Sequence, residues 1–99
     1  MKLKINSVHF TADIKLLDFV KEKVGKLEVF FDRVVEGQIY LRVNNEQGEE
    51  NKTVEITLIV PGKQLFAKEK AKTFEEATVL ATDALEKQLK RFKSKLKKR

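Results

Sequence analysis

The chain has 99 residues, of which 21 are Lys or Arg and 15 are Asp or Glu, so its formal net charge at pH 7 is +6. This length suffices for one self-supporting core, and we expect a single domain over residues 1–99. The absence of cysteine excludes disulfides and thiolate metal sites, no apolar run is long enough for a signal peptide or a membrane span, and both facts favour a cytoplasmic protein.

The first third of the chain predicts a strand followed by a helix. Apolar and charged residues alternate over 2–5, and the apolar positions then shift to Val8 and Phe10, which favours a strand with a bulge. From about Asp13 the period becomes that of an amphipathic helix. Its apolar side comprises Leu16, Leu17, Val20, Val24, Leu27 and Phe31.

Three further strands are expected in the middle of the chain. Residues 34–43 are apolar at every second position from Val35, and residues 53–60 repeat the pattern from Val54. A polar stretch separates these two strands, and Pro61–Gly62 signals a tight turn into a shorter strand over 64–70. Consecutive strands joined in this way form an antiparallel meander.

A second helix begins at a capping box formed by Thr73 and Glu76. Its apolar positions continue to Leu96, so a helix over 74–96 would be about 34 Å long and would overhang a domain of this size. The element order β-α-β-β-β-α predicts an α+β fold with two helices packed on one face of a four-stranded sheet.

Positive charge is concentrated at the end of this second helix. Residues 87–99 contain eight Lys or Arg and no carboxylate, whereas residues 1–86 contain 13 Lys or Arg and all 15 carboxylates. The body is therefore −2 and the end is +8, an asymmetry typical of proteins that contact nucleic acids or anionic membranes.

Three interpretations of this basic end remain open on composition and periodicity. The cations can serve solubility, and two have i,i+4 partners, Asp83 with Lys87 and Glu86 with Lys90. They can follow a phosphate backbone, with Phe19 or Tyr40 as a stacking surface, although both rings also suit ordinary packing. In the membrane alternative, the helix would bury its apolar residues in an anionic headgroup layer; these are Leu85, Leu89, Phe92 and Leu96.

Catalysis has few candidate residues in this sequence. His9 is the one histidine and has no cysteine partner, and the two serines, Ser7 and Ser94, are far apart in the expected fold. There is no glycine-rich phosphate loop. We therefore expect no enzyme activity, no catalytic residue, no metal site and no cofactor.

Three segments resemble those of a known family: KEKVGKLEVFFDRVV at 21–35, VEITLIVPGKQLFAKE at 54–69 and FEEATVLATDALEKQLKR at 74–91. Over essentially its whole length the chain resembles the short ribosome hibernation promoting factors, also called ribosome-associated inhibitor or sigma-54 modulation proteins. The resemblance implies a fold akin to the double-stranded-RNA-binding domain. It also implies a place in the small ribosomal subunit, between head and body, where such proteins block messenger and transfer RNA in stationary phase or starvation.

The resemblance also implies the partner and the contacts. The partner would be the small ribosomal subunit and its rRNA, with no small-molecule substrate and no membrane. The expected rRNA contacts are Lys87, Lys90, Arg91, Lys95 and Lys98, assisted by Lys23, Lys26, Lys68 and Lys70. Long members of the family add a C-terminal dimerisation domain, which we expect this chain to lack, so the free protein should be a monomer.

Overall fold

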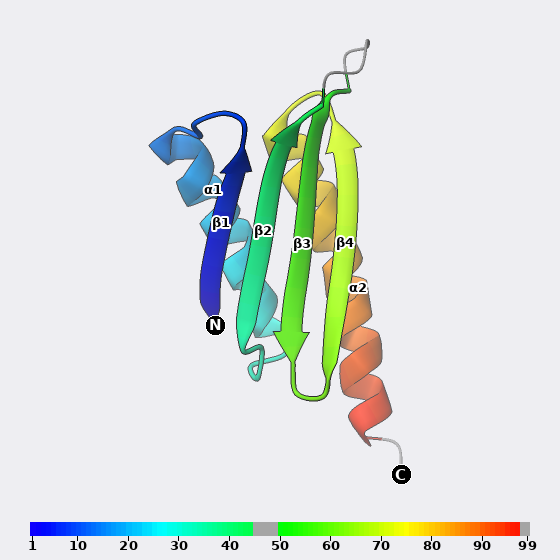
Figure 1. Ribbon diagram of the computed structural model, residues 1–99. Helices are drawn as coiled ribbons and strands as arrows, with labels where there is room; N and C mark the ends of the chain where they lie inside the picture. The colour runs from blue at the N-terminus through cyan, green and yellow to red at the C-terminus, as the bar shows by residue number, and fades with distance from the viewer. Residues whose placement is uncertain (45–49, 98–99) are drawn as a thin grey trace.

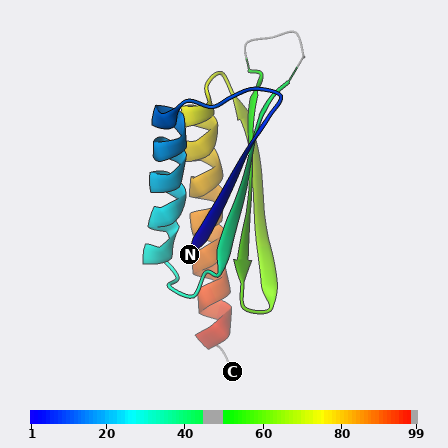
Figure 2. The same ribbon diagram turned by 60° about the vertical axis from the view of Figure 1, so that its left-hand side comes forward.

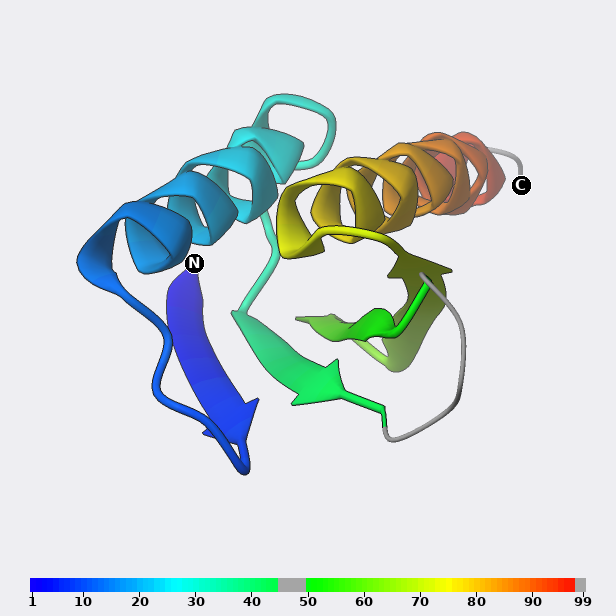
Figure 3. The same ribbon diagram turned by 90° about the horizontal axis from the view of Figure 1, so that it is seen from above.

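The computed structural model describes residues 1–44 and 50–97, with only the backbone described at Lys97. The elements, in chain order, are β1 (Lys2–Val8), α1 (Ile14–Gly25), the 3-10 helix η1 (Lys26–Val29), β2 (Glu36–Val43), β3 (Lys52–Val60), β4 (Lys63–Ala71) and α2 (Phe74–Lys97). The strands form one four-stranded sheet. Figure 1 shows both α-helices behind this sheet, and Figures 2 and 3 show that they lie on the same face of it. The predicted element order and two-layer arrangement are confirmed, while the likeness to a double-stranded-RNA-binding domain stays a prediction.

The strands lie in the order β1-β2-β3-β4. β1 runs parallel to β2, and the chain connects them through α1. β2, β3 and β4 are antiparallel neighbours, which confirms the predicted meander. The register places Ile39 opposite Ile56 and Ile56 opposite Ala67, so β2, β3 and β4 present one continuous apolar row to the helices.

α1 is capped by a side chain at its start and is followed directly by a 3-10 turn at its end. The backbone N–H of Leu16 donates to Asp13 Oδ1 at 2.8 Å, which caps the helix, and Val20 and Val24 are fully buried. The helix stops at Gly25 and tightens into η1. Phe31 therefore lies outside the helix, and the prediction that it extends the helical stripe is wrong. It is nevertheless buried, with 4% of its surface exposed, and packs edge-on against Phe92 with ring centroids 5.3 Å apart.

The entry into β2 also differs from the sequence pattern. The strand begins at Glu36, and Val35, expected to alternate with the core residues, is 58% exposed, whereas Val34 is buried. The backbone explains this difference. The Val35 N–H donates to the Ile59 carbonyl at 2.8 Å and the Val35 carbonyl accepts from the Lys2 N–H at 3.1 Å, so the backbone of this residue joins β1 to β3 while its side chain stays outside.

β1 contains no bulge, contrary to the sequence-based expectation. Its pairing with β2 is unbroken from Lys2 opposite Glu36 to Val8 opposite Arg42. Val8 lies on the same face of the strand as Lys2 and Lys4, and the chain turns sharply at the next residue, His9, whose φ is +64°. This turn returns Phe10 to the helical side, where it stacks on Phe74 with centroids 5.0 Å apart.

α2 is anchored at its start and overhangs at its end. The Glu76 N–H donates to Thr73 Oγ1 at 3.1 Å, which confirms the hydroxyl half of the capping box. The 24 residues of α2 give about 36 Å of helix, and Figure 1 shows its end beyond the β3–β4 turn. Leu85 and Leu89 are fully buried, whereas Leu96 is 45% exposed. Within the described ranges, no helix combines the length and hydropathy of a membrane span.

The positive φ at His9 gives a test of the turn that replaces the expected bulge. A non-glycine residue in the left-handed region costs about 1–2 kcal/mol, and a β-branched residue is accommodated worst. We expect His9→Val to lower the free energy of unfolding by at least about 1 kcal/mol relative to His9→Gly, because glycine adopts this conformation without steric cost. Urea unfolding monitored by circular dichroism would measure both variants, and equal stabilities would contradict the φ assigned to this residue.

Candidate nucleic-acid interface

The second half of α2 presents cations on two sides of a helix whose third side is buried. From Lys87 to Lys97 the helix has six Lys or Arg and no carboxylate. At about 100° per residue, one stripe lies toward η1 and the other toward β4. The first stripe contains Lys90 and Lys93, the second contains Lys87, Arg91 and Lys95, and all five side chains are exposed. The buried side consists of Leu85, Leu89 and the half-buried Phe92.

The stripe toward η1 has aromatic neighbours. Lys90 Nζ lies 2.9 Å from Glu86 Oε2 and 5.1 Å from the centroid of the Phe30 ring. Lys90, Lys93 and Ser94 line a hollow of about 400 Å³ together with Val29 and Phe30. One predicted i,i+4 pair, Glu86 with Lys90, is thereby confirmed. This hollow combines two cations, a hydroxyl and a ring, a composition suited to a phosphate and a sugar or base.

The stripe toward β4 is fixed by a side chain that bonds to the sheet. Gln88 Nε2 donates to the Phe66 carbonyl of the edge strand β4 at 2.8 Å. The bond lies one residue from Lys87 and three from Arg91, so it holds this part of the helix at the sheet edge. Because the apolar side is packed and the edge is bonded, these cations project from a rigid support.

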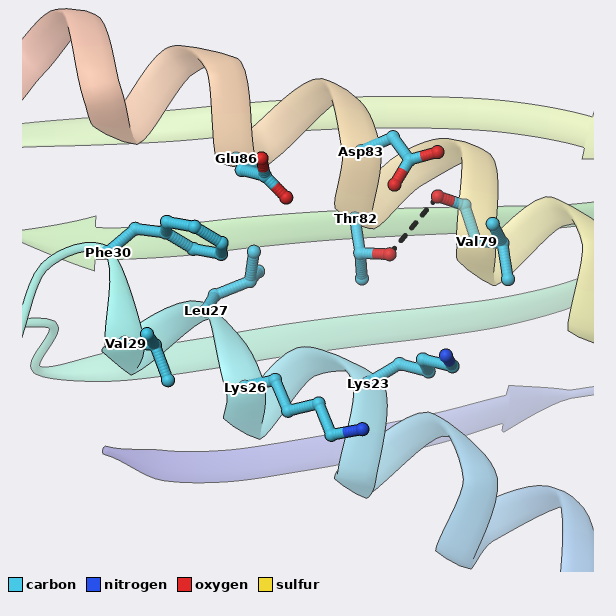
Figure 4. A pocket seen from close by; sticks show the side chains of 9 residues that line it. All are labelled: Lys23, Lys26, Leu27, Val29, Phe30, Val79, Thr82, Asp83 and Glu86. Atoms are coloured by element: carbon cyan, nitrogen blue, oxygen red, sulfur yellow. Dashed lines mark hydrogen bonds between the residues drawn. The ribbon is translucent and has the colours of Figure 1, made fainter.

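Lys23 and Lys26 lie beside the other half of α2. They line a groove of about 390 Å³ between the helices, and Figure 4 shows them facing Asp83 and Glu86 across it. Lys26 Nζ is 3.2 Å from Glu22 Oε1, and Lys23 Nζ is 5.7 Å from the Phe19 ring centroid. The groove thus contains two cations and two carboxylates, so its local charge is balanced and differs from that of the basic end.

Lys68 and Lys70 lie on β4, away from both the basic end of α2 and the interhelical groove. They alternate along β4 with the buried Ala67 and Ala71, so their side chains lie on the uncovered face of the sheet. The nine predicted contacts are therefore not one surface. Four are on the basic end of α2, two are in the interhelical groove and two are on the opposite face, while Lys98 lies outside the described residues.

Sequence reasoning missed three residues beside the basic end: Lys93, Arg33 and Phe30. Lys93 is three residues from Lys90 on the same stripe, so helical periodicity alone could have identified it. Arg33 and Phe30 belong to the irregular segment after η1, where no period applies. The Arg33 guanidinium lies 5.2 Å from the Phe31 ring centroid, and that ring packs on Phe92 of α2.

The described residues contain no group of three His, Cys, Asp or Glu side chains placed to hold a metal ion. His9 is exposed at the turn before α1. The chemistry that the arrangement supports is electrostatic binding of anions on a rigid helix.

Comparison with known proteins agrees with this picture. Residues 3–97 match the family model described as "Sigma 54 modulation protein / S30EA ribosomal protein". A protein of Pseudomonas putida named "Ribosome hibernation promoting factor" is 30% identical over 95 residues, which cover 96% of this chain and 89% of that protein. A "Ribosome hibernation promotion factor" of Bacillus subtilis is 28% identical over 99 residues, the whole of this chain and 52% of that protein.

Two solved structures share the fold. The N-terminal domain of Protein Y from Thermus thermophilus superposes with a TM-score of 0.81 at 24% identity, covering 93% of this chain and 99% of that one. A ribosomal subunit interface protein from Coxiella burnetii superposes with a TM-score of 0.84 at 18% identity, covering 95% of this chain and 99% of that one. These likenesses establish the architecture, and the match over residues 3–97 establishes the family: the chain belongs to the sigma 54 modulation protein / S30EA ribosomal protein family.

Proposed function

We propose that the protein is a ribosome hibernation factor that binds the small ribosomal subunit through rRNA phosphates and inhibits translation by occupying the channel of messenger and transfer RNA. The observation that supports this most directly is the basic second half of α2, with six cations and no carboxylate from Lys87 to Lys97. The names of the relatives from Pseudomonas putida and Bacillus subtilis point to the same process.

The physical basis of binding is the release of counterions from RNA. Cations gathered on one rigid helix repel one another in the free protein. When they bind RNA phosphates, this repulsion is relieved and the counterions condensed on the RNA are released. Arg91 can contact a phosphate through two N–H groups, whereas the lysines act as point charges. Since phosphate contacts do not read sequence, this surface would recognise the shape of folded rRNA more than particular bases.

Inhibition would follow from occupancy alone. The family consists of ribosome-associated modulation factors and the chain is not an enzyme. A bound protein of this kind acts by excluding other ligands, with one protein for each ribosome. It would work in the cytoplasm, where ribosomes are, when growth stops.

The steepness of the salt dependence tests the electrostatic account. If the five exposed cations described on α2 each meet a phosphate, log K should fall with log salt at a slope between about −4 and −5. Affinity for the small subunit should then decrease roughly five hundredfold between 50 and 200 mM salt at constant Mg²⁺. Cosedimentation at several salt concentrations measures the slope. A nearly flat response, or binding to anionic lipid vesicles without binding to ribosomes, would contradict the proposal.

A pair of matched variants tests the location of the contacts. Lys87→Gln with Arg91→Gln removes two cations from the basic end, whereas Lys15→Gln with Lys21→Gln removes two exposed cations from α1. Glutamine keeps helix propensity, so both proteins should unfold at nearly the parent temperature. The first variant should bind the small subunit about tenfold more weakly, with a salt slope smaller by about two, and the second should bind like the parent. Equal losses in the two variants would assign binding to net charge instead of this surface.

The stoichiometry of inhibition tests occupancy. In a translation assay with purified ribosomes, activity should fall in proportion to the ratio of protein to ribosome and reach its minimum near one to one. Transfer RNA or messenger bound beforehand should delay inhibition, because it fills the same channel. Full inhibition far below one protein for each ribosome would require turnover and would contradict the mechanism.

A further inference from the structure

The uncovered face of the sheet has two exposed aromatic side chains that the proposed function does not use. Tyr40 on β2 is 37% exposed and Phe66 on β4 is 51% exposed. Tyr40 pairs with Glu55 and Phe66 with Thr57, so the two rings stand in neighbouring rows, two strands apart. With strands about 4.8 Å apart and about 6.8 Å between alternate residues, their Cα atoms are separated by roughly 12 Å.

Positive charge prevails on the same face. Among the described strand residues, those that point to this side include five cations and two carboxylates: Lys2, Lys4, Arg42, Lys68 and Lys70, against Glu36 and Glu55. Both carboxylates are paired with cations. Arg42 Nε lies 2.6 Å from Glu55 Oε2, and Lys4 Nζ lies 3.6 Å from Glu36 Oε1. The face therefore attracts anions, and its carboxylates are already neutralised.

The surroundings of Tyr40 are held in place by these pairs. The Arg42 guanidinium lies 5.6 Å from the Tyr40 ring centroid, and Glu55, whose side chain is 20% exposed, fixes it there. Further along β2, on the same face, Gln38 Nε2 donates to Glu36 Oε2 at 2.7 Å. This bond, with the charge of Lys4, lowers the pKa of Glu36, so its carboxylate remains ionised and bonded. The polar groups around the rings are thus ordered before any ligand arrives.

We propose that the uncovered sheet face binds single-stranded RNA, with one base stacked on Tyr40 and another on Phe66. The separation of roughly 12 Å far exceeds the 3.4 Å between stacked bases, so the two bases must be unstacked from each other, as in single strands and not in duplexes. Lys68, in the row of Tyr40, and Lys70 at the β4 end of the face would contact the phosphates. The half-buried Thr57, beside Phe66, offers a hydroxyl to a base edge.

Charge and composition disfavour two other ligands for this face, a second copy of the protein and an anionic membrane. A second copy placed face to face would set five cations against five cations. An anionic membrane would meet two rings that lie two strands apart, with the polar Glu55 and Thr57 of β3 between them. A single strand suits both features, because its phosphates match the cations and every base has a face for stacking. The inference is independent of the rRNA contacts on α2, which lie on the opposite side of the sheet.

The amino-acid composition provides a direct optical test. The chain has one tyrosine and no tryptophan, so Tyr40 dominates the ultraviolet emission. Titration of the purified full chain with a seven-nucleotide uridine RNA should quench that emission as a base stacks on the ring. The same titration with a short RNA duplex should leave it nearly unchanged. The Lys87→Gln, Arg91→Gln variant should show the same quenching as the parent, which separates this face from the basic end of α2.

A matched pair of aromatic substitutions completes the test. Phe66→Leu removes the proposed stacking ring and keeps an apolar side chain, and Phe19→Leu makes the same change on α1. Phe66→Leu should weaken uridine RNA binding about five- to hundredfold, with Phe19→Leu binding like the parent. The inference is overturned if RNA binds without quenching, if the duplex quenches equally, or if the two variants bind alike. A tyrosine emission per molecule that changes with protein concentration in the absence of RNA would also overturn the inference, because a second copy would then occupy the face.

Discussion

The burial of one side of α2 against the sheet is the interaction on which the rest of the structure depends. Leu85 and Leu89 are fully buried, and each such side chain contributes about 1.5–3 kcal/mol when it leaves water. Because the same helix has its cations at the remaining positions, packing alone determines that they point outward. A helix that buries its leucines on a sheet cannot also bury them in a lipid headgroup layer. The membrane interpretation is thereby limited to Leu96, which is 45% exposed beyond the sheet.

α2 also divides lengthwise into two parts of opposite charge. From Phe74 to Glu86 it has four carboxylates and no cation, and from Lys87 to Lys97 it has six cations and no carboxylate. The acidic part begins at the Thr73 cap, where negative charge favours the helix dipole, and the basic part ends at the opposite pole, where positive charge does. The dipole acts within about one turn at each end, so it accounts for few of these charges. Asp83 and Glu86 of the acidic part line the interhelical groove together with Lys23 and Lys26, which leaves the basic part as the surface suited to RNA.

The sequence predicts the parts of this fold that follow a period and fails where the period breaks. Helix and strand order, the cap at Thr73 and the packing of Leu85 follow from spacing alone. The conformations of Phe31, Val35 and His9 do not, because each lies at a junction where tertiary contacts determine the backbone. Among the site residues, the lysines of α2 could be predicted because helix periodicity separates their side from the apolar one. Lys68 and Lys70 do not lie with them, because strand alternation places these two on the far face of the sheet. Family membership confirms the further expectation, drawn from the lack of a catalytic constellation, that the chain is not an enzyme.

The separation of the cations onto two sides has a consequence for how the molecule could fill a channel. The Cα atoms span 49 × 24 × 18 Å, so the uncovered sheet face and the exposed side of α2 are separated by little more than the thickness of two layers. If both proposals hold, RNA could be contacted on both sides of the protein at once. A protein bound on two sides dissociates less readily than one bound on a single side, because the second contact forms at a high effective concentration once the first is made. Tight occupancy would then require neither a large apolar interface nor any chemical step, only two rigid basic surfaces set back to back by the packing of α2 on the sheet.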